Sequence, residues 1–342
     1  MQCKVIGIDL AKQSMQVCLL GMDQKVLSNK KISRGKLMLE LSKISPDVPV
    51  AMEACGTSHY WGRRFKEMGR EVILLPAQHV KPLVGHQKND AHDAIAICEA
   101  SQRPRIHPVS LKTVEQQDIQ SLRRVRKRHV DNRTALGNQM RGLCAEYGVF
   151  FNPSFKSLRA ELIVALENES NELSTLLREE LREMYSELLT CDANVKRLDK
   201  LLQSVMQQNP SYALLREIPG VGPLISAALI GELGDGRHFD RGREFSACCG
   251  LVPKQHSSGS TERLLGITKN GNRELRTLLI HGARAVVYRY KSKDNALGRW
   301  LAALITRRGV HKAIVALANK LARITWAVLR YQQPFAMNRA FG

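Results

Sequence analysis

The sequence predicts a mixed α/β domain followed by a mainly α-helical remainder. Short apolar runs separated by turn residues fill the first hundred positions, whereas leucines at helical spacing dominate much of the chain after residue 112. The chain has 342 residues, of which 44% are hydrophobic, and this supports two or three folded domains rather than a disordered chain.

The first part of the chain alternates strands and helices in the order β-β-β-α-β-α-β-α. Three adjacent apolar runs predict an antiparallel meander, at residues 3–9, 15–20 and 24–32. Helices are expected at 35–44, 57–68 and 90–101, and buried strands at 48–54 and 71–76. This order indicates a mixed sheet rather than a pure βαβ repeat.

The middle of the chain predicts long helices. Residues 112–146 and 153–208 have helical patterning, and the second stretch is rich in leucine flanked by Glu and Lys. The pattern fits a coiled coil that dimerises two chains, and equally a two-helix arm within one chain. We therefore expect a catalytic domain at 1–110, a helical linker and dimerisation region at 111–210, and a further domain at 211–342.

The last region predicts short helices joined by a glycine turn. Residues 215–234 place Gly220 and Gly222 between two helical patterns, which resembles a helix-hairpin-helix that grips nucleic-acid backbone, although inert bundles also use such turns. Residues 243–249, 272–290 and 309–331 are expected to be helical, and 250–271 a loop.

The charge points to a polyanionic partner. The net charge is +20, and residues 241–342 carry 19 basic and 4 acidic side chains. Nucleic acid explains this asymmetry better than an anionic membrane surface or solvated helix faces. The sequence has no apolar run of membrane-spanning length and no signal peptide, and its eight cysteines show no metal-binding spacing, so a cytoplasmic protein with reduced thiols is expected.

Four carboxylates are placed as a metal centre would require. Asp9 and Glu53 each end a predicted strand, and Asp90 and Asp93 share one face of a predicted helix. Such a set suits two Mg²⁺ ions that promote phosphoryl transfer. Taken singly, Asp90 could be only a helix cap and Glu53 only a turn residue. The element order and acid placement resemble those of the ribonuclease H-like fold of RuvC-type resolvases.

The sequence resembles the DEDD transposases, insertion-sequence recombinases related to the Piv-type DNA invertases. The resemblance rests on VIGIDLAKQSMQVCLL, AMEACGTSHYW and KNDAHDAIAICEA, followed by IPGVGPLISAALIGELGD and FSACCGLVPKQHSSGSTERLLGITKNGNRELRTLLIHGARA. It covers residues 1–105 and 212–330, and it implies the tetrad Asp9, Glu53, Asp90 and Asp93. It also implies that Ser258, before Gly259, attacks DNA, in one composite site with the tetrad that separate protomers could share.

Basic side chains lie around Ser258 and in the stretch of sequence that comes after the first domain. A loop that only grips phosphate, without a covalent role for Ser258, is the alternative, and Ser257 and Ser260 are close enough to confuse the assignment. The candidate nucleic-acid contacts are Arg123, Arg124, Arg126, Lys127, Arg128, Gly220, Gly222, Lys254, Arg263, Lys269, Arg273 and Arg276.

The resemblance implies Mg²⁺-dependent DNA cleavage, strand exchange and rejoining through a serine–DNA link. It implies a dimer or tetramer acting on element ends and target DNA, and a non-coding bridge-type RNA as guide. The rivals are an invertase without RNA, a RuvC-like nuclease or junction resolvase that uses water, and a non-catalytic scaffold.

Overall fold

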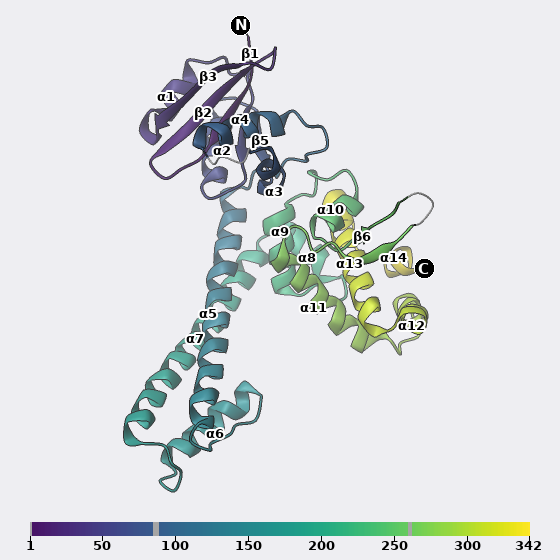
Figure 1. The fold of residues 1–342 in the computed structure, drawn as a ribbon. Coiled ribbons are helices and arrows are strands. Elements are labelled where there is room, and N and C mark those ends of the chain that lie inside the picture. The colour runs from purple at the N-terminus through teal and green to yellow at the C-terminus, as the bar shows by residue number, and fades with distance from the viewer. Residues whose placement is uncertain (1, 85–88, 259–261) are drawn as a thin grey trace. The chain divides into compact units, whose positions relative to one another are not determined.

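The computed structural model describes residues 2–84, 89–258 and 262–342, and it divides the chain into two compact units. The N-terminal unit is Met1–Val114 and the C-terminal unit is Glu115–Gly342. Figure 1 shows the sheet of the first unit and the mainly helical second unit. The predicted division into a mixed α/β part and a helical remainder is confirmed.

A five-stranded sheet of order β3-β2-β1-β4-β5 forms the N-terminal unit. Its strands are β1 (Cys3–Asp9), β2 (Ser14–Gly21), β3 (Val26–Ser33), β4 (Val50–Glu53) and β5 (Val72–Leu75). The first three pair antiparallel, as the predicted meander requires, while β4 is parallel to β1 and β5 is parallel to β4. The topology places the ends of β1 and β4 side by side.

Helices cover the sheet because its strands are apolar on both faces. On one face, α1 (Leu37–Ser42) and α2 (Ser58–Glu67) pack against Ile6 and Ile8. On the other, α4 (Asp90–Ser101) packs against Val5 and Ala51. All of these elements lie within two residues of their expected bounds. The short helix α3 (Ala77–Val80) and the 3₁₀ helix Lys81–Leu83 were not predicted, while the 3₁₀ helix Arg34–Lys36 lies at the start of the helix expected at 35–44.

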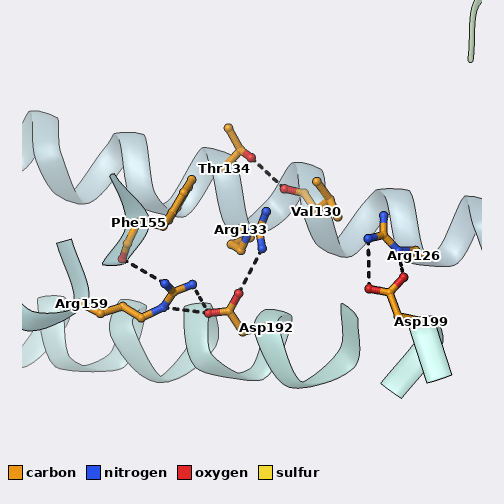
Figure 2. Close-up of polar contacts among 8 residues, drawn as sticks. All are labelled: Arg126, Val130, Arg133, Thr134, Phe155, Arg159, Asp192 and Asp199. Atoms are coloured by element: carbon orange, nitrogen blue, oxygen red, sulfur yellow. Dashed lines mark hydrogen bonds and ion pairs between the residues drawn. The ribbon is translucent and has the colours of Figure 1, made fainter. Parts of the chain in front are cut away.

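The C-terminal unit begins with an arm of three helices within one chain. These are α5 (Val114–Ala145), α6 (Phe155–Glu167) and α7 (Thr175–Gln207), and buried leucines and methionine join them. Arg126 pairs with Asp199 at 2.6 Å and Arg133 pairs with Asp192 at 3.3 Å, so α5 and α7 run antiparallel (Figure 2). An arm within one chain is therefore present, with three helices where two were expected, while dimerisation through it remains a prediction.

The rest of the C-terminal unit is a bundle around one hydrophobic core. Its helices are α8 (Pro210–Arg216), α9 (Pro223–Leu233), α10 (Gly242–Cys248), α11 (Arg273–Tyr290), α12 (Ala296–Arg308), α13 (Val310–Tyr331) and α14 (Met337–Phe341). Helix α9 is buried on nearly every side, which explains why all its residues except Ser226 and Glu232 are apolar or glycine. The helices α12 and α14 were not predicted.

The expectation of a loop at 250–271 is wrong in part. Strands β6 (Pro253–Gln255) and β7 (Leu264–Ile267) form an antiparallel hairpin. Its residues are almost all exposed, so the alternation of buried and solvated positions that marks a strand in sequence is missing.

Two other expectations concern membrane-spanning segments and the cysteines. No helix in the described ranges is both long and apolar enough to cross a membrane. All eight cysteines are free, and five of them are buried, in agreement with the predicted thiols.

Candidate functional site

The acidic cluster is built on the sheet's central strands. The last registered pair of β1 and β4 is Ile8–Met52, and Asp9 and Glu53 are the next residue of each strand. Side chains alternate between faces, and Ile8 and Met52 belong to the core on the α1–α2 face. Asp9 and Glu53 therefore point to the opposite face, which α4 covers.

Helix α4 supplies the other two acids from its first turn. The Asn89 side chain caps the helix by accepting a hydrogen bond from the Ala91 N–H at 3.0 Å, and Asp90 and Asp93 follow. Carboxylates are favoured at this end of a helix because its free N–H groups are partially positive. Asn29 of β3 also donates to the Ala91 carbonyl at 2.9 Å, which ties the start of α4 to the sheet.

A glycine lets α4 approach the sheet closely. A Cβ atom at Gly7 would lie 2.5 Å from both the Ala94 carbonyl oxygen and the Cys98 sulfur. Gly7 has the same parity as Asp9 along β1, so it holds α4 against the face on which that carboxylate lies. Any larger residue would push the helix, and with it Asp90 and Asp93, away from the strand ends.

The four acids converge. Ligand oxygens of Asp9, Asp90 and Asp93 lie within 4.8 Å of one another. Glu53 lines a cavity of about 440 Å³ together with Asp9 and Asp93. Burial and the neighbouring Asp93, Asp90 and Glu53 raise the pKa of Asp9 to about 6. Clustered carboxylate oxygens are the donors that a hard divalent cation prefers, so this donor set fits such an ion.

One basic side chain also lines the acidic cavity. Lys81, in the 3₁₀ helix after α3, shares the cavity with Asp9, Glu53 and Asp93. Sequence reasoning missed Lys81 because the short 3₁₀ helix that carries it has no periodic pattern. Its position in the sequence, 28 residues after Glu53, did not indicate that it would lie beside the acidic residues.

Ser258 lies in the exposed β6–β7 hairpin of the C-terminal unit. The hairpin closes through a hydrogen bond from the His256 N–H to the Arg263 carbonyl at 2.9 Å. Ser257, not Ser258, supports the turn: its hydroxyl accepts from Gln255 at 3.1 Å and from the Arg263 N–H at 3.3 Å. Gly259 and Ser260 lie outside the described residues, as does Lys88 of the third N-terminal motif.

The basic residues expected around the serine separate into two groups. Lys254, Arg263, Lys269 and Arg273 are exposed. Arg276 is different: its side chain is 8% exposed and donates to the carbonyls of Cys249 and Asn270, both at 2.9 Å. The structure gives Arg276 the role of joining α11 to the base of the hairpin, so it is not a surface contact.

The basic stretch on α5 also divides. Arg123 is 3% exposed and pairs with Glu274 at 2.8 Å, so it joins α5 to α11 instead of facing a partner. Arg126 is held by Asp199, and Lys127 pairs with Asp131 at 2.5 Å. Arg124 and Arg128 are exposed, and no carboxylate in the described ranges pairs with them.

The glycine turn between α8 and α9 packs against α11. Gly220 has a φ of 84°, and a Cβ on Gly282 would lie 2.3 Å from the Gly220 carbonyl oxygen. Arg216 donates to the Val221 carbonyl at 3.1 Å and fixes the turn. A cavity of about 420 Å³ lies over it, lined by the turn itself with Arg216, Gly222, Arg289 and Tyr290. Gly220 thus has a packing role, and Gly222 caps α9 beside two arginines.

Comparison with known proteins gives matches along nearly the whole chain. A model of the DEDD transposases of IS110 elements matches residues 6–148, and a model described as "Transposase IS116/IS110/IS902 family" matches residues 212–298. A "Probable family 20 transposase" of Pseudomonas aeruginosa is 43% identical over 95% of this chain and 96% of its own length. The "Transposase for insertion sequence element IS1111A" of Coxiella burnetii is also 43% identical, over 97% and 91%.

A more distant relative has a name that indicates a different role. The "Pilin gene-inverting protein" of Moraxella bovis is 27% identical over 59% of this chain and 68% of its own length.

Proposed function

The chain belongs to the IS110 family of DEDD transposases, which are DNA-cleaving and rejoining recombinases, and we propose that its acidic cluster and Ser258 carry out this reaction. The membership confirms the resemblance that the sequence motifs predicted. The convergence of Asp9, Asp90 and Asp93 on one edge of the sheet is the observation that carries the proposal. The strand order β3-β2-β1-β4-β5, with β2 antiparallel to its neighbours, supports a ribonuclease H-like assignment of this unit.

The carboxylates of Asp9, Glu53, Asp90 and Asp93 would hold divalent cations, which we propose to be two Mg²⁺ ions. When bound, the ions would neutralise charge on the scissile phosphate and activate the attacking oxygen. The chain's own part is to fix four oxygen donors on two strand ends and one helix, so that little reorganisation accompanies the reaction.

Ser258 is the proposed nucleophile. Its hydroxyl oxygen forms a bond to a DNA phosphorus, and the bond from that phosphorus to one deoxyribose oxygen breaks. The serine loses its hydroxyl proton and the released deoxyribose oxygen gains one, which leaves a phosphoserine link to the other strand end. Attack by a hydroxyl of a new strand reverses the step and rejoins DNA. The exposed Lys254 and Arg263 flank the serine and would bind the phosphate oxygens.

Paired variants test this assignment. Asp93→Asn should abolish strand cleavage, and Ser258→Ala should abolish both cleavage and the protein–DNA adduct seen on a denaturing gel. Glu99→Gln, an exposed change on the same helix, and Ser292→Ala, at an exposed serine of the C-terminal unit, are the matched controls. Cleavage that survives Ser258→Ala but not Asp93→Asn would show a water-using nuclease or resolvase. Cleavage that survives both changes would show that neither group takes part.

Guidance by a non-coding RNA and assembly into dimers or tetramers complete the proposal. The exposed Arg124 and Arg128 are the candidate contacts to the RNA. Sequencing RNA that co-purifies from the native host should show enrichment of transcripts from DNA flanking the gene, and random cellular RNA would contradict guidance. Light scattering of the purified protein gives the oligomeric state.

An invertase that acts without RNA is the second candidate. The observation that favours it is the similarity to the pilin gene-inverting protein of Moraxella bovis. Element ends on both sides of the gene would support the transposase, whereas an invertible segment between recombination sites would support the invertase.

A further inference from the structure

A cavity lies between α13 and the chain segment that follows it. Gln332 adopts a left-handed conformation with a φ of 51°, which ends α13 and turns residues 333–340 back along it. The space measures about 340 Å³, within the range of small-ligand sites. Ala327, Ala336 and Ala340 all line it, so small side chains on both walls leave the cavity open.

The lining combines an apolar floor with an aromatic edge. Ile324, Val328 and Phe335 contribute apolar surface. Tyr331 is 60% exposed, although its ring contacts Trp326 with the centroids 5.8 Å apart and the ring planes at 80°. The contact fixes the orientation of the phenol ring while leaving most of it open to a ligand.

The polar part of the lining is cationic. Lys320, Arg323 and Arg339 line the cavity, none of its lining residues is acidic, and the sequence has no Asp or Glu after Asp294. No carboxylate within the described ranges pairs with these three cations. Lys320 is held 4.8 Å from the Phe341 ring and 5.0 Å from the Trp300 ring. Burial and the neighbouring Arg323 lower the pKa of Lys320, and an anion nearby would offset both effects.

We propose that this cavity binds one unstacked nucleotide of single-stranded nucleic acid. The base would lie against Tyr331 and the apolar floor, with its flanking phosphates on Arg323 and Arg339. A nucleotide in a single strand combines a planar base with an anionic backbone. It therefore matches a cavity that offers both apolar and cationic surface. The inference rests on the family's action on nucleic acid, but not on the proposed roles of the acids or of Ser258.

Binding of short labelled oligonucleotides to the full-length protein tests the site. Fluorescence anisotropy is measured with 12-nucleotide oligo-dT, 12-nucleotide oligo-rU and a DNA duplex of equal length. Tyr331→Ala should weaken binding of the single strands about ten-fold, since stacking on an aromatic ring is worth about that factor per base. Tyr331→Phe should bind as the unchanged protein does. A stronger effect on one oligonucleotide identifies DNA or RNA as the source of the nucleotide.

Two further variants distinguish binding in the cavity from general electrostatic attraction to the basic protein. Ala336→Leu fills the space without changing charge, and it should weaken single-strand binding while leaving duplex binding unchanged. Arg323→Gln is compared with Lys312→Gln, an equal loss of charge on the same helix but outside the cavity. Tyr60→Ala removes another exposed tyrosine, 51% exposed, from the N-terminal unit.

The outcomes are distinguishable. Selective loss with Tyr331→Ala, Ala336→Leu and Arg323→Gln, but not with Lys312→Gln or Tyr60→Ala, supports the site. Unchanged single-strand binding in Tyr331→Ala and Ala336→Leu overturns it, as do equal losses in Arg323→Gln and Lys312→Gln. In either of those cases, intact duplex binding and strand cleavage would leave the proposed function standing.

Discussion

Asp9 is held in surroundings that favour either a proton or a cation. It lies partly buried at the end of the central strand β1, among three other carboxylates. The raised pKa, about 6, means that the folded chain without metal pays for ionising this group near neutral pH. A bound divalent cation would remove that cost.

Asp9→Asn should therefore stabilise the metal-free protein at pH 7.5 but not at pH 4. The folded pKa of about 6 exceeds the ordinary 3.8, so the folded chain binds more protons in this window and loses stability as the pH rises through it. After allowance for solvent screening of a half-exposed group, the gain is about 1 kcal/mol. Urea unfolding with chelator at the two pH values measures it. An equal effect at both pH values would contradict the explanation, and Glu99→Gln is the control.

Gly282→Ala should destabilise the C-terminal unit by about 2 kcal/mol. The added methyl group would lie 2.3 Å from the Gly220 carbonyl oxygen and 2.8 Å from Ile225, so either α11 or the α8–α9 turn must move. Gly142→Ala on α5 is the matched control, because its Cβ would meet nothing within 4 Å. That control should stabilise the protein by about 0.5–1 kcal/mol through helix propensity. Thermal unfolding compares the two, and similar melting temperatures would be inconsistent with the close approach.

At the scale of elements, the arm is held by ion pairs as well as by leucines. Asp192 of α7 accepts from Arg133 of α5 and also from Arg159 of α6, so one half-buried carboxylate joins all three helices (Figure 2). Phe155 lies beneath the guanidinium groups of both arginines, 5.2 Å from Arg133 and 5.8 Å from Arg159.

Asp192→Ala should cost about 1–3 kcal/mol, since it leaves two partly buried guanidinium groups without their carboxylate. Asp131→Ala removes only an exposed pair with Lys127 and should cost less than about 0.5 kcal/mol. Chemical unfolding followed by helical circular dichroism measures both. If the two variants lose equal stability, the pairs seen on the arm do not stabilise it.

The elements that carry the acids could be predicted because their own sequences specify them. Apolar runs ending at Asp9 and Glu53 predicted both strand ends, and Asn89 marked the start of α4. The β6–β7 hairpin could not be predicted, because its exposed strands have no buried face to pattern them. Local sequence also could not show that Arg123 is buried, since its partner Glu274 lies far away along the chain.

At the scale of the whole molecule, the net charge of +20 predicts strongly salt-dependent DNA binding. If 6–10 phosphates are contacted, duplex affinity should fall by roughly 10³–10⁵ between 50 and 200 mM salt. Arg124 and Arg128 are the proposed RNA contacts, so replacing both by Gln should reduce the slope of log RNA affinity against log salt by about 2, since each lost phosphate contact removes about one. Arg126→Gln, whose side chain is already held by Asp199, should change the slope less. Equal changes would count against specific contacts.

The placement of Asp9 and Glu53 on adjoining strands of the sheet has a consequence for how the two regions proposed to react exchange their amide hydrogens. The amide groups of β1 and β4 are bonded within the sheet and covered by α4, so they should exchange hydrogen for deuterium only when the whole N-terminal unit opens. The β6–β7 hairpin, in which Ser258 lies, is a two-stranded sheet whose residues are almost all exposed. Its amides can therefore exchange through local opening. The strand ends that carry Asp9 and Glu53 should therefore open only with the whole N-terminal unit, whereas the β6–β7 hairpin should open locally.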